Sequence, residues 1–193
     1  MNEAPAVPVL RRSLEDEVAS IHTEHAAALL RYARSITGCP ETAWEGVQEA
    51  FLRYFVERSY GREIRYPKAW LFEVLRNYLR DRASARSVQY EIPIEIVDSR
   101  PDQSPSPELL VGGIQAAQQI AESLSGRELE CLLLRSEGLS YGEIGVAMQV
   151  RIGTVGALLA RAHEKIRRVA GADSGGPVIA AAMLHLIEDR PAC

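Results

Sequence analysis

Apolar residues recur at helical spacing through residues 139–168, and the pattern predicts two short helices separated by a tight break. Ser140 and Glu143, three residues later, form a capping box that marks the start of the first helix. Residues 149–151 form the break, and the second helix starts near Ile152 or Gly153. Its apolar positions are Val155, Leu158, Leu159, Ala162 and Ile166. This arrangement is typical of a helix-turn-helix, whose second helix enters the major groove of DNA, although two amphipathic helices of an ordinary bundle would have the same spacing.

Residues 14–37 carry an apolar stripe that predicts either one long helix or two shorter ones. The stripe comprises Val18, Ile21, Ala26, Leu29, Leu30, Ala33 and Ile36. Gly38 suits a C-terminal cap, and Pro40 follows where the helix has ended. Residues 1–12 contain two prolines and are expected to be a loose lead-in to this helix.

Two further helices are predicted before residue 87. Thr42 and Glu45 form a second capping box, and the helix that follows runs to about Glu57. Its buried positions are Val47, Ala50, Phe51, Tyr54 and Phe55. Pro67 suits the first position of the next helix. The core positions of that helix are Leu71, Val74, Leu75, Tyr78 and Leu79.

The chain changes character at residues 87–106, where prolines and acidic residues predict a linker rather than a helix. A new helix is expected from residue 107 to about 124. Ser125 and Glu128 then form a third capping box, which starts a helix that Gly138 closes. Its core positions are Leu129, Leu132 and Leu133.

Signals for β-strands are almost absent, so we predict an all-α protein. It consists of two small helical domains joined by a flexible linker, and the second is a helix-turn-helix domain. The predicted boundaries are 13–86 for the first domain, 87–106 for the linker, 107–170 for the second domain and 171–193 for a C-terminal tail with one short helix.

The charges of the chain are unevenly distributed. A net charge of -4 excludes a uniformly basic nucleic-acid binder. Residues 58–86 hold eight Arg or Lys against three Asp or Glu, residues 87–123 hold one against six, and residues 124–170 hold seven against five. Two basic blocks around an acidic connector permit DNA binding through patches, although chance clustering of solvated charges would look the same.

The three cysteines are scattered and show no metal-ligand spacing, so neither a metal site nor a cofactor is predicted. Together with the absence of an N-terminal secretory signal, they predict a cytoplasmic location. The longest apolar run, residues 178–187, is too short to span a membrane, so no membrane partner is expected. No nucleophile–base set or phosphate loop is recognisable, and the chain is not expected to be an enzyme.

The amino-acid sequences of these helices and their order along the chain resemble those of an extracytoplasmic-function (ECF) sigma factor of the bacterial sigma-70 family. In the first block, LLRYARSITG, VQEAFLRYF and YPKAWLFEVLRNYLRD are similar to sigma region two. In the second block, LSGRELECLLLRSEGLSYGEIGVAM, GTV and LARAHEKIRR are similar to sigma region four. The resemblance covers about residues 14–168, and both sets of motifs in this order make it specific.

The resemblance implies a transcription initiation factor that binds core RNA polymerase and directs it to promoter DNA. Residues implied to dock on the clamp helices of the largest polymerase subunit are Glu45, Gln48, Glu49, Leu52 and Arg53. Residues implied to melt and read the −10 promoter element are Arg62, Arg65, Tyr66, Lys68, Trp70, Arg76, Asn77 and Arg80. Residues implied to read the −35 element are Arg151, Thr154, Arg161 and Lys165. Many members of the family are held by an anti-sigma factor, which is therefore a further expected partner.

These residue types suit the implied tasks. Cations bind the phosphates of separated strands, and aromatic rings stack on unpaired bases. Side chains near the start of a recognition helix reach base edges. Tyr66 and Trp70 would serve equally well as anchors of the core, and the cations from Lys68 to Arg82 as an ordinary solvated face.

The sequence departs from the family pattern at two places. The Lys-Ser-Arg-like run that usually follows Gly-Thr-Val is replaced by Gly156, Ala157 and Leu158, so two expected cations are missing. Fewer phosphate contacts weaken DNA binding, and an interior glycine costs a helix roughly 1 kcal/mol. In the first block, the usual acidic-acidic-Leu run is replaced by residues 44–46, Trp-Glu-Gly, which retain one acid.

Two other functions remain open from the sequence. A transcriptional regulator with a LuxR-like helix-turn-helix would share the second block but would leave VQEAFLRYF and YPKAWLFEVLRNYLRD unexplained. A sigma-like protein-binding adaptor that has lost promoter binding would account for the missing cations after GTV.

Overall fold

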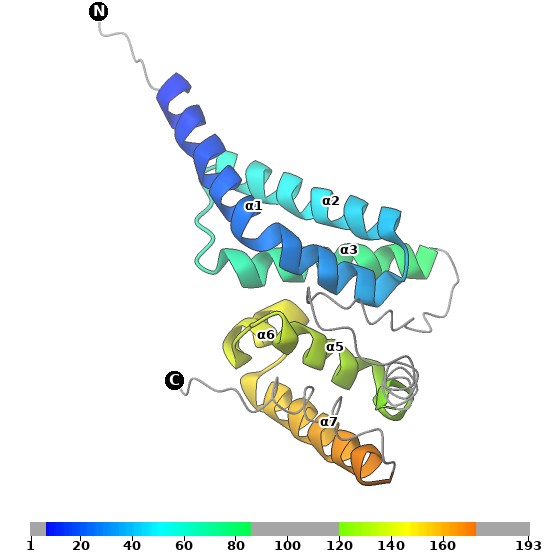
Figure 1. Cartoon of the computed structure of the whole chain (residues 1–193). Coiled ribbons are helices and arrows are strands. Elements are labelled where there is room, and N and C mark those ends of the chain that lie inside the picture. Colours follow the sequence, from blue (N-terminus) through cyan, green and yellow to red (C-terminus); the bar gives the residue numbers. More distant parts are fainter. Residues whose placement is uncertain (1–6, 86–119, 173–193) are drawn as a thin grey trace, which may run out of the picture. The chain divides into compact units, whose positions relative to one another are not determined.

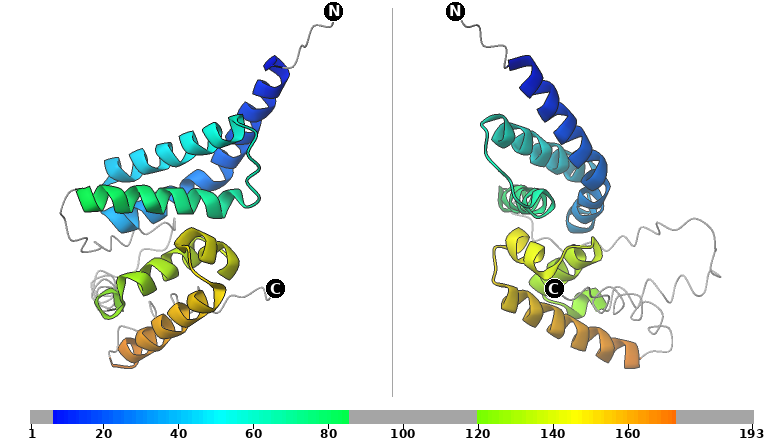
Figure 2. Two further views of the ribbon diagram at one scale, coloured as in Figure 1. Left: turned by 180° about the vertical axis from the view of Figure 1, so that it is seen from behind. Right: turned by 90° about the vertical axis from the view of Figure 1, so that its left-hand side faces the viewer.

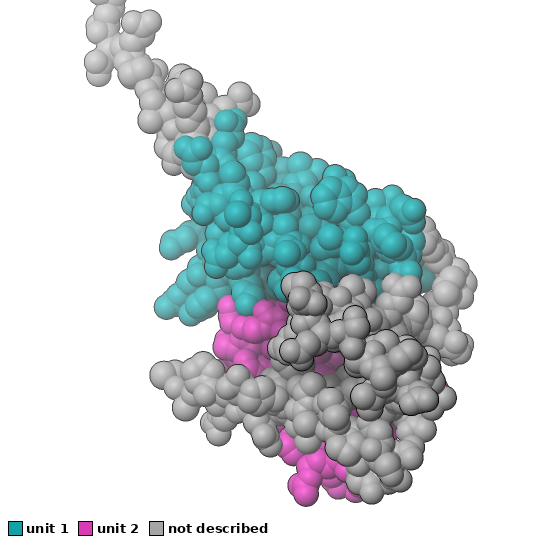
Figure 3. All heavy atoms as spheres, in the orientation of Figure 1, with its two compact units in different colours: residues 1–91 teal, residues 92–193 magenta. Residues whose placement is uncertain are grey.

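The computed structural model describes residues 7–85 and 120–172, and every regular element in these ranges is an α-helix (Figure 1). The chain divides into two compact units, residues 1–91 and 92–193, which Figure 3 colours separately. The predicted fold class, an all-α chain with two helical domains, is confirmed. The predicted linker of residues 87–106, most of the predicted helix of residues 107–124 and the tail from residue 173 lie outside the described residues.

Three helices form the first unit: α1 (Val7–Thr37), α2 (Pro40–Ser59) and α3 (Pro67–Ala85). Each packs on the other two, and the N-terminal turns of α1 extend past the ends of α2 and α3 (Figures 1 and 2). Their apolar faces meet in a core whose largest fully buried side chains are Leu29, Tyr32, Tyr54, Leu71, Phe72 and Leu75. Tyr32 of α1 and Phe72 of α3 meet edge to face, with ring centroids 5.4 Å apart, a favourable arrangement for two aromatic rings.

The first two helices start earlier than the sequence predicted. Helix α1 is one helix rather than two, and it starts at Val7, within the expected lead-in. Pro8 does not prevent this, because the first turn of a helix has no intrahelical partners for its N–H groups. Helix α2 starts at Pro40 for the same reason, with Cys39 as its N-cap.

The predicted capping box of Thr42 and Glu45 is therefore wrong. Thr42 lies inside α2 and is buried, and its hydroxyl donates to Sγ of Cys39 at 3.3 Å. The early start at Pro40 leaves no N-cap position at residue 42. The glycine cap of α1 is confirmed, since Gly38 adopts φ 59° and its N–H donates to the carbonyl of Arg34.

Helices α2 and α3 approach each other closely at Gly46. A Cβ atom at this position would lie 2.8 Å from Cδ1 of Leu75 and 3.2 Å from Cδ2 of Leu79. A side chain on residue 46 would have to displace buried leucines of α3. The glycine that replaces leucine of the family pattern is thus built into the packing of this unit.

The second unit contains α5 (Gly126–Ser136), α6 (Tyr141–Met148) and α7 (Ile152–Ala172), preceded by a short helical stretch at residues 120–123. Both predicted capping boxes are confirmed: Ser125 pairs with Glu128 at the start of α5, and Ser140 with Glu143 at the start of α6. The predicted apolar positions of α7 are all buried. On α5, Leu129 and Leu132 are buried as predicted, but Leu134 replaces Leu133 in the core.

A tight turn at residues 149–151 separates α6 from α7, as predicted. Gln149 adopts the left-handed conformation with φ 56°. A Cβ on Gly145 would lie 3.0 Å from the carbonyl oxygen of Val150, so the turn comes back closely onto α6. The two helices are bent by 102°, within the range of helix-turn-helix motifs.

Candidate nucleic-acid interface

The outer face of α2 exposes large apolar side chains. Trp44, Leu52 and Val56 are 50%, 58% and 40% exposed, respectively. Together with the exposed Gln48 they follow one another at intervals of four residues, which places them along one side of the helix. We call Trp44, Gln48, Leu52 and Val56 the α2 stripe. Exposed apolar side chains on one helix face make this surface a candidate for binding another molecule.

Charged residues flank the α2 stripe and are already paired. Glu45 accepts hydrogen bonds on Oε2 from Nη2 of Arg82 at 2.8 Å and from the hydroxyl of Tyr78 at 3.4 Å, and so links α2 to α3. Glu49 and Arg53 form an ion pair one helical turn apart, with 2.6 Å between Oε1 and Nε. Of the five residues predicted for polymerase binding, Leu52 is the only large apolar one. Trp44 and Val56 are exposed on the same face but were not among the predicted residues, although their spacing from Leu52 could have indicated them.

The loop between α2 and α3 exposes aromatic and cationic side chains together. Tyr60 is 85% exposed and Tyr66 is 53% exposed. The guanidinium carbon of Arg65 lies 5.5 Å from the ring centroid of Tyr66, within cation–π distance. Arg62 is exposed and pairs with Glu57 at 2.8 Å. Tyrosine rings and guanidinium groups in one exposed loop are the groups that bind unpaired bases and phosphates.

The predicted outer face of α3 is only partly exposed. Arg76 is 8% exposed, so it does not belong to a solvated face of cations. Arg80 is exposed, and Lys68, Trp70 and Asn77 are half-buried. Trp70 packs edge to face against Tyr54 of α2 at 5.8 Å between ring centroids, which makes it in part an anchor of the core.

Arg58 connects α1, α2 and the loop. Its Nε and Nη2 atoms donate to the two carboxylate oxygens of Glu17 at 2.7 and 2.9 Å, and its Nη1 atom donates to the backbone carbonyl of Arg62 at 2.8 Å. The hydroxyl of Tyr54 also donates to Glu17, at 2.9 Å. The Arg58 hydrogen bond lowers the pKa of Glu17, whereas burial, followed by the bond to Glu17, raises the pKa of Tyr54 to about 12. This paired arginine holds the loop backbone against the helices.

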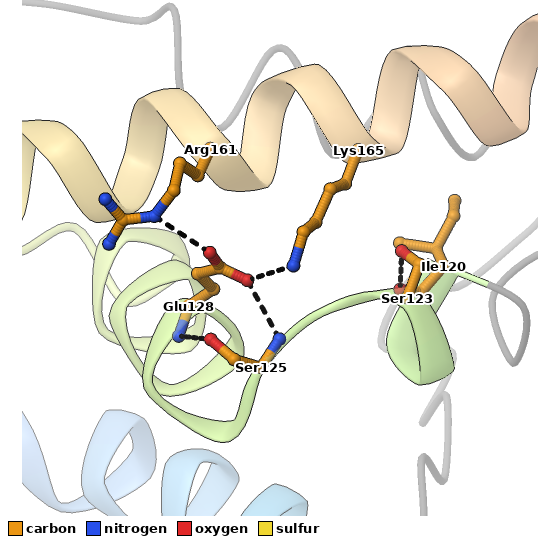
Figure 4. A network of polar contacts seen from close by, with 6 residues as sticks. All are labelled: Ile120, Ser123, Ser125, Glu128, Arg161 and Lys165. Carbon is orange, nitrogen blue, oxygen red and sulfur yellow. Dashed lines mark hydrogen bonds and ion pairs between the residues drawn. The ribbon is translucent and has the colours of Figure 1, made fainter.

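The residues predicted to read the −35 element divide into two groups. Arg151 and Thr154 lie exposed at the start of α7. Arg161 and Lys165 instead reach toward α5, where Arg161 Nε donates to Oε1 of Glu128 at 3.1 Å and Lys165 Nζ donates to Oε2 at 2.7 Å (Figure 4). The sequence did not indicate this role, because the partners are 33 and 37 residues apart.

Glu128 is buried, with 4% of its side chain exposed, and it remains ionised through its hydrogen bonds. Burial by itself raises the pKa of this carboxyl, but the bonds from Lys165, Ser125 and Arg161 outweigh it and lower the pKa to about 2. Oε2 accepts from the backbone N–H of Ser125 at 2.8 Å, and the N–H of Glu128 donates to the Ser125 hydroxyl (Figure 4). One carboxylate thus caps α5 and fastens α7 to it.

The two units match two sigma factor families. Residues 21–88, which include the loop and the α2 stripe, match Sigma-70 region 2, and residues 114–166, which include the helix-turn-helix, match Sigma-70, region 4. ECF RNA polymerase sigma factor SigL of Mycobacterium tuberculosis is 32% identical over 155 residues, which are 77% of this chain and 85% of that protein. The chain belongs to the ECF sigma factors.

Further relatives of this sigma factor agree with the assignment. ECF RNA polymerase sigma factor SigE of Mycolicibacterium smegmatis is 27% identical over 75% of this chain, which spans 58% of the length of that protein. The crystal structure of the sigma factor RpoE of Bartonella quintana, in complex with the anti-sigma factor NepR, has a TM-score of 0.53 and 25% identity, covering 84% of this chain and 99% of RpoE. Such relatives are transcription regulators rather than enzymes.

Within residues 7–85 and 120–172, no group of three or more His, Cys, Asp or Glu side chains could hold a metal ion. No single helix of this part of the chain is long and apolar enough to cross a membrane. Only α6 and α7 taken together reach the required length and composition, and most of the large apolar side chains of that bent pair are buried in the second unit.

Proposed function

We propose that this sigma factor binds core RNA polymerase through the α2 stripe and its flanking residues. The exposed Trp44, Leu52 and Val56 support this, because large apolar side chains aligned on one helix face suit a helical partner. The partner surface would be the clamp helices of the largest polymerase subunit. The paired Glu45, Glu49 and Arg53 would form the polar rim of the contact, where charges fix orientation more than they add affinity.

The loop of residues 60–66 and the exposed part of α3 would open and read the −10 element. Tyr60 and Tyr66 supply stacking surfaces, and Arg62, Arg65 and Arg80 supply cations. Trp70 would support these residues from the edge of the core, together with Lys68 and Asn77. Arg76 is buried and is no longer proposed to contact DNA.

The helix-turn-helix of the second unit would read the −35 element through the start of α7. Arg151 and Thr154 are exposed there, as reading of base edges requires. Arg161 and Lys165 would act mainly by holding α7 on α5 through Glu128. One observation carries the whole proposal: three different kinds of exposed surface lie on three different parts of the chain. They are the α2 stripe, the loop of residues 60–66 with its tyrosines and arginines, and the polar residues at the start of α7.

The site of action would be the cytoplasm, where polymerase and promoter DNA are found. An anti-sigma factor is proposed as a regulator, because the similar RpoE has been solved in complex with the anti-sigma factor NepR. Such a factor is expected to abolish transcription directed by this chain when it is added before polymerase.

Run-off transcription with the purified full chain, core RNA polymerase and genomic promoter fragments tests the proposal. Specific transcripts that are absent without the chain would support it. Leu52→Asp should weaken binding to polymerase, whereas Tyr66→Ala should leave that binding unchanged and reduce opening of the promoter. Ala27→Asp, at an exposed position of α1, is the matched control for a new acid. Polymerase binding without promoter selection would favour an adaptor, and DNA binding without polymerase binding would favour a LuxR-like regulator.

A further inference from the structure

The start of α7 exposes a large apolar side chain beside two polar ones. Ile152, the first residue of the helix, is 59% exposed, and its neighbours Arg151 and Thr154 are also exposed. Across residues 120–169, whose side chains the structure describes, Val146 is the only other exposed large apolar residue of the second unit. Exposing an isoleucine to water is unfavourable, and Ile152 is the more exposed of these two residues.

Ile152 and the following Gly153 are both exposed at the start of α7. A Cβ added at Gly153 would meet nothing within 4 Å. On the inner side, Cγ1 of Ile152 lies 3.9 Å from where a Cβ on Gly145 would stand, so the side chain rests over α6 at its base. Ile152 therefore borders α6 on one side through Cγ1, while 59% of the residue stays exposed.

Arg161 and Lys165 lie away from the start of α7. Arg161 and Lys165 donate hydrogen bonds to the buried Glu128. They also lie nine and thirteen residues beyond Ile152, which at 1.5 Å per residue corresponds to about 14 Å or more along the helix axis. Arg151, Ile152 and Thr154 thus form the exposed surface at the start of the helix.

We propose that Ile152 reads the C5 methyl group of a thymine in the upstream promoter element. Among the groups that bases present in the major groove, the thymine methyl is the apolar one, and apolar side chains recognise it by contact. The first residues of the second helix are those that reach base edges in a helix-turn-helix. The flanking Arg151 supplies a phosphate or guanine contact and Thr154 a hydroxyl, which favours DNA over an apolar protein surface as the occupant.

The inference rests on the proposed function, since it assigns one specificity contact to the helix that is proposed to read the −35 element. It predicts that the base opposite Ile152 is selected by contact with its methyl group rather than by a hydrogen bond from a cationic side chain. The replacement of the usual Lys-Ser-Arg-like run by Gly156, Ala157 and Leu158 is consistent with such a shift from ionic to apolar contacts.

Thymine-to-uracil replacement in DNA tests the contact, because deoxyuridine lacks only the C5 methyl. The probe is a promoter fragment recovered in the run-off experiment, with each thymine of its upstream element replaced in turn, bound by the full chain together with core polymerase. One replacement should weaken binding roughly fourfold, as expected for losing one buried methyl group. Ile152→Ala should bind the original and replaced fragments equally, whereas Val146→Ala should keep the difference.

Each outcome decides one claim. Specific transcription with no uracil effect at any position would overturn the methyl contact and leave the proposed function standing. A uracil effect that persists in Ile152→Ala would also overturn it. Weakened polymerase binding by Ile152→Ala, measured without DNA, would make this a protein-docking residue instead. Absence of any promoter-specific binding by the wild type would overturn the proposed function together with the inference. Circular dichroism of Ile152→Ala confirms that the exposed substitution leaves the helices folded.

Discussion

Glu128 and Lys165 meet across the second unit, with 2.7 Å between Oε2 and Nζ. The carboxylate is 4% exposed, whereas the ammonium is 35% exposed. Arg161 binds the other carboxylate oxygen. Helix α5 is therefore joined to α7, the helix proposed to read DNA, by one buried acid and two partly exposed cations.

Replacing Glu128 by glutamine should destabilise the second unit by about 2 kcal/mol, because hydrogen bonds to charged partners are lost and the N-terminal cap of α5 is weakened. Both tryptophans, Trp44 and Trp70, lie in the first unit. Tryptophan fluorescence therefore reports on the first unit, while far-ultraviolet circular dichroism reports on both. In urea denaturation of the full chain, Glu128→Gln should shift the dichroism transition without shifting the fluorescence transition.

Glu164→Gln is the matched control for that experiment. Glu164 pairs with Arg168 one turn along α7, and both side chains are well exposed. Pairs of this kind contribute little to stability, so the expected change is below about 0.5 kcal/mol. Equal effects of the two substitutions would show that burial of Glu128 adds nothing to its ion pairs.

Acid should weaken the second unit through the same carboxyl. Its folded-state pKa of about 2 lies below the ordinary value of 4.5. Glu128 therefore stabilises the folded state at and above about pH 4.5, and this contribution is lost as the pH falls toward 2. Between these values, the dichroism transition of the wild type should move to lower urea more steeply than that of Glu128→Gln. Parallel curves for the two proteins would contradict the lowered pKa.

Two glycines should respond in opposite ways to alanine. Gly156→Ala should stabilise the chain by about 0.5–1 kcal/mol, because the site is inside α7 and a Cβ there meets nothing within 4 Å. Gly46→Ala should destabilise it by about 1–3 kcal/mol, because its Cβ would lie 2.8 Å from Cδ1 of the buried Leu75. Urea denaturation measures both, with the Gly46 effect in tryptophan fluorescence and the Gly156 effect in dichroism. Stabilisation by Gly46→Ala would mean that Leu75 moves aside without cost.

The helices and their apolar faces could be predicted from the sequence because the signals are local. The Ser125 and Ser140 capping boxes act over three residues, and the predicted apolar positions of α7 are buried because helical spacing places them on one side. Thr42 and Glu45 carried the same cap signal as Ser125 and Glu128, but Pro40 had already started the helix. A capping box in the sequence does not mark a helix start where an earlier residue, here Pro40, already begins the helix.

The candidate site was less predictable, because its geometry depends on contacts between distant residues. The resemblance to sigma region two implied that Arg76 contacts DNA, yet Arg76 is buried in the folded unit. Arg161 and Lys165 were assigned to DNA, and only the fold shows that both bind Glu128. The exposure of Trp44 and Ile152 likewise depends on which helix faces are covered by others.

Arg58→Lys should reduce promoter opening while leaving the affinity for core polymerase unchanged. The arginine binds Glu17 through two nitrogens and the carbonyl of Arg62 through a third. A lysine keeps the charge but, as a compact ammonium, does not reproduce this fork. The loop of residues 60–66 would then lose one anchor. Losing one charge-assisted hydrogen bond corresponds to roughly a tenfold decrease in the fraction of promoters that are open.

Opening is measured by the fluorescence of 2-aminopurine placed in the −10 element, and affinity by anisotropy of labelled chain titrated with core polymerase. Leu52→Asp is the reciprocal control, since it lies on the α2 stripe and should weaken affinity. Glu17→Gln separates the roles of the two Arg58 contacts, because it weakens the link to α1 but leaves the bond to the Arg62 carbonyl in place. Normal opening by Arg58→Lys would show that the loop holds its conformation without the arginine, and the tyrosines would then need no anchor to reach DNA.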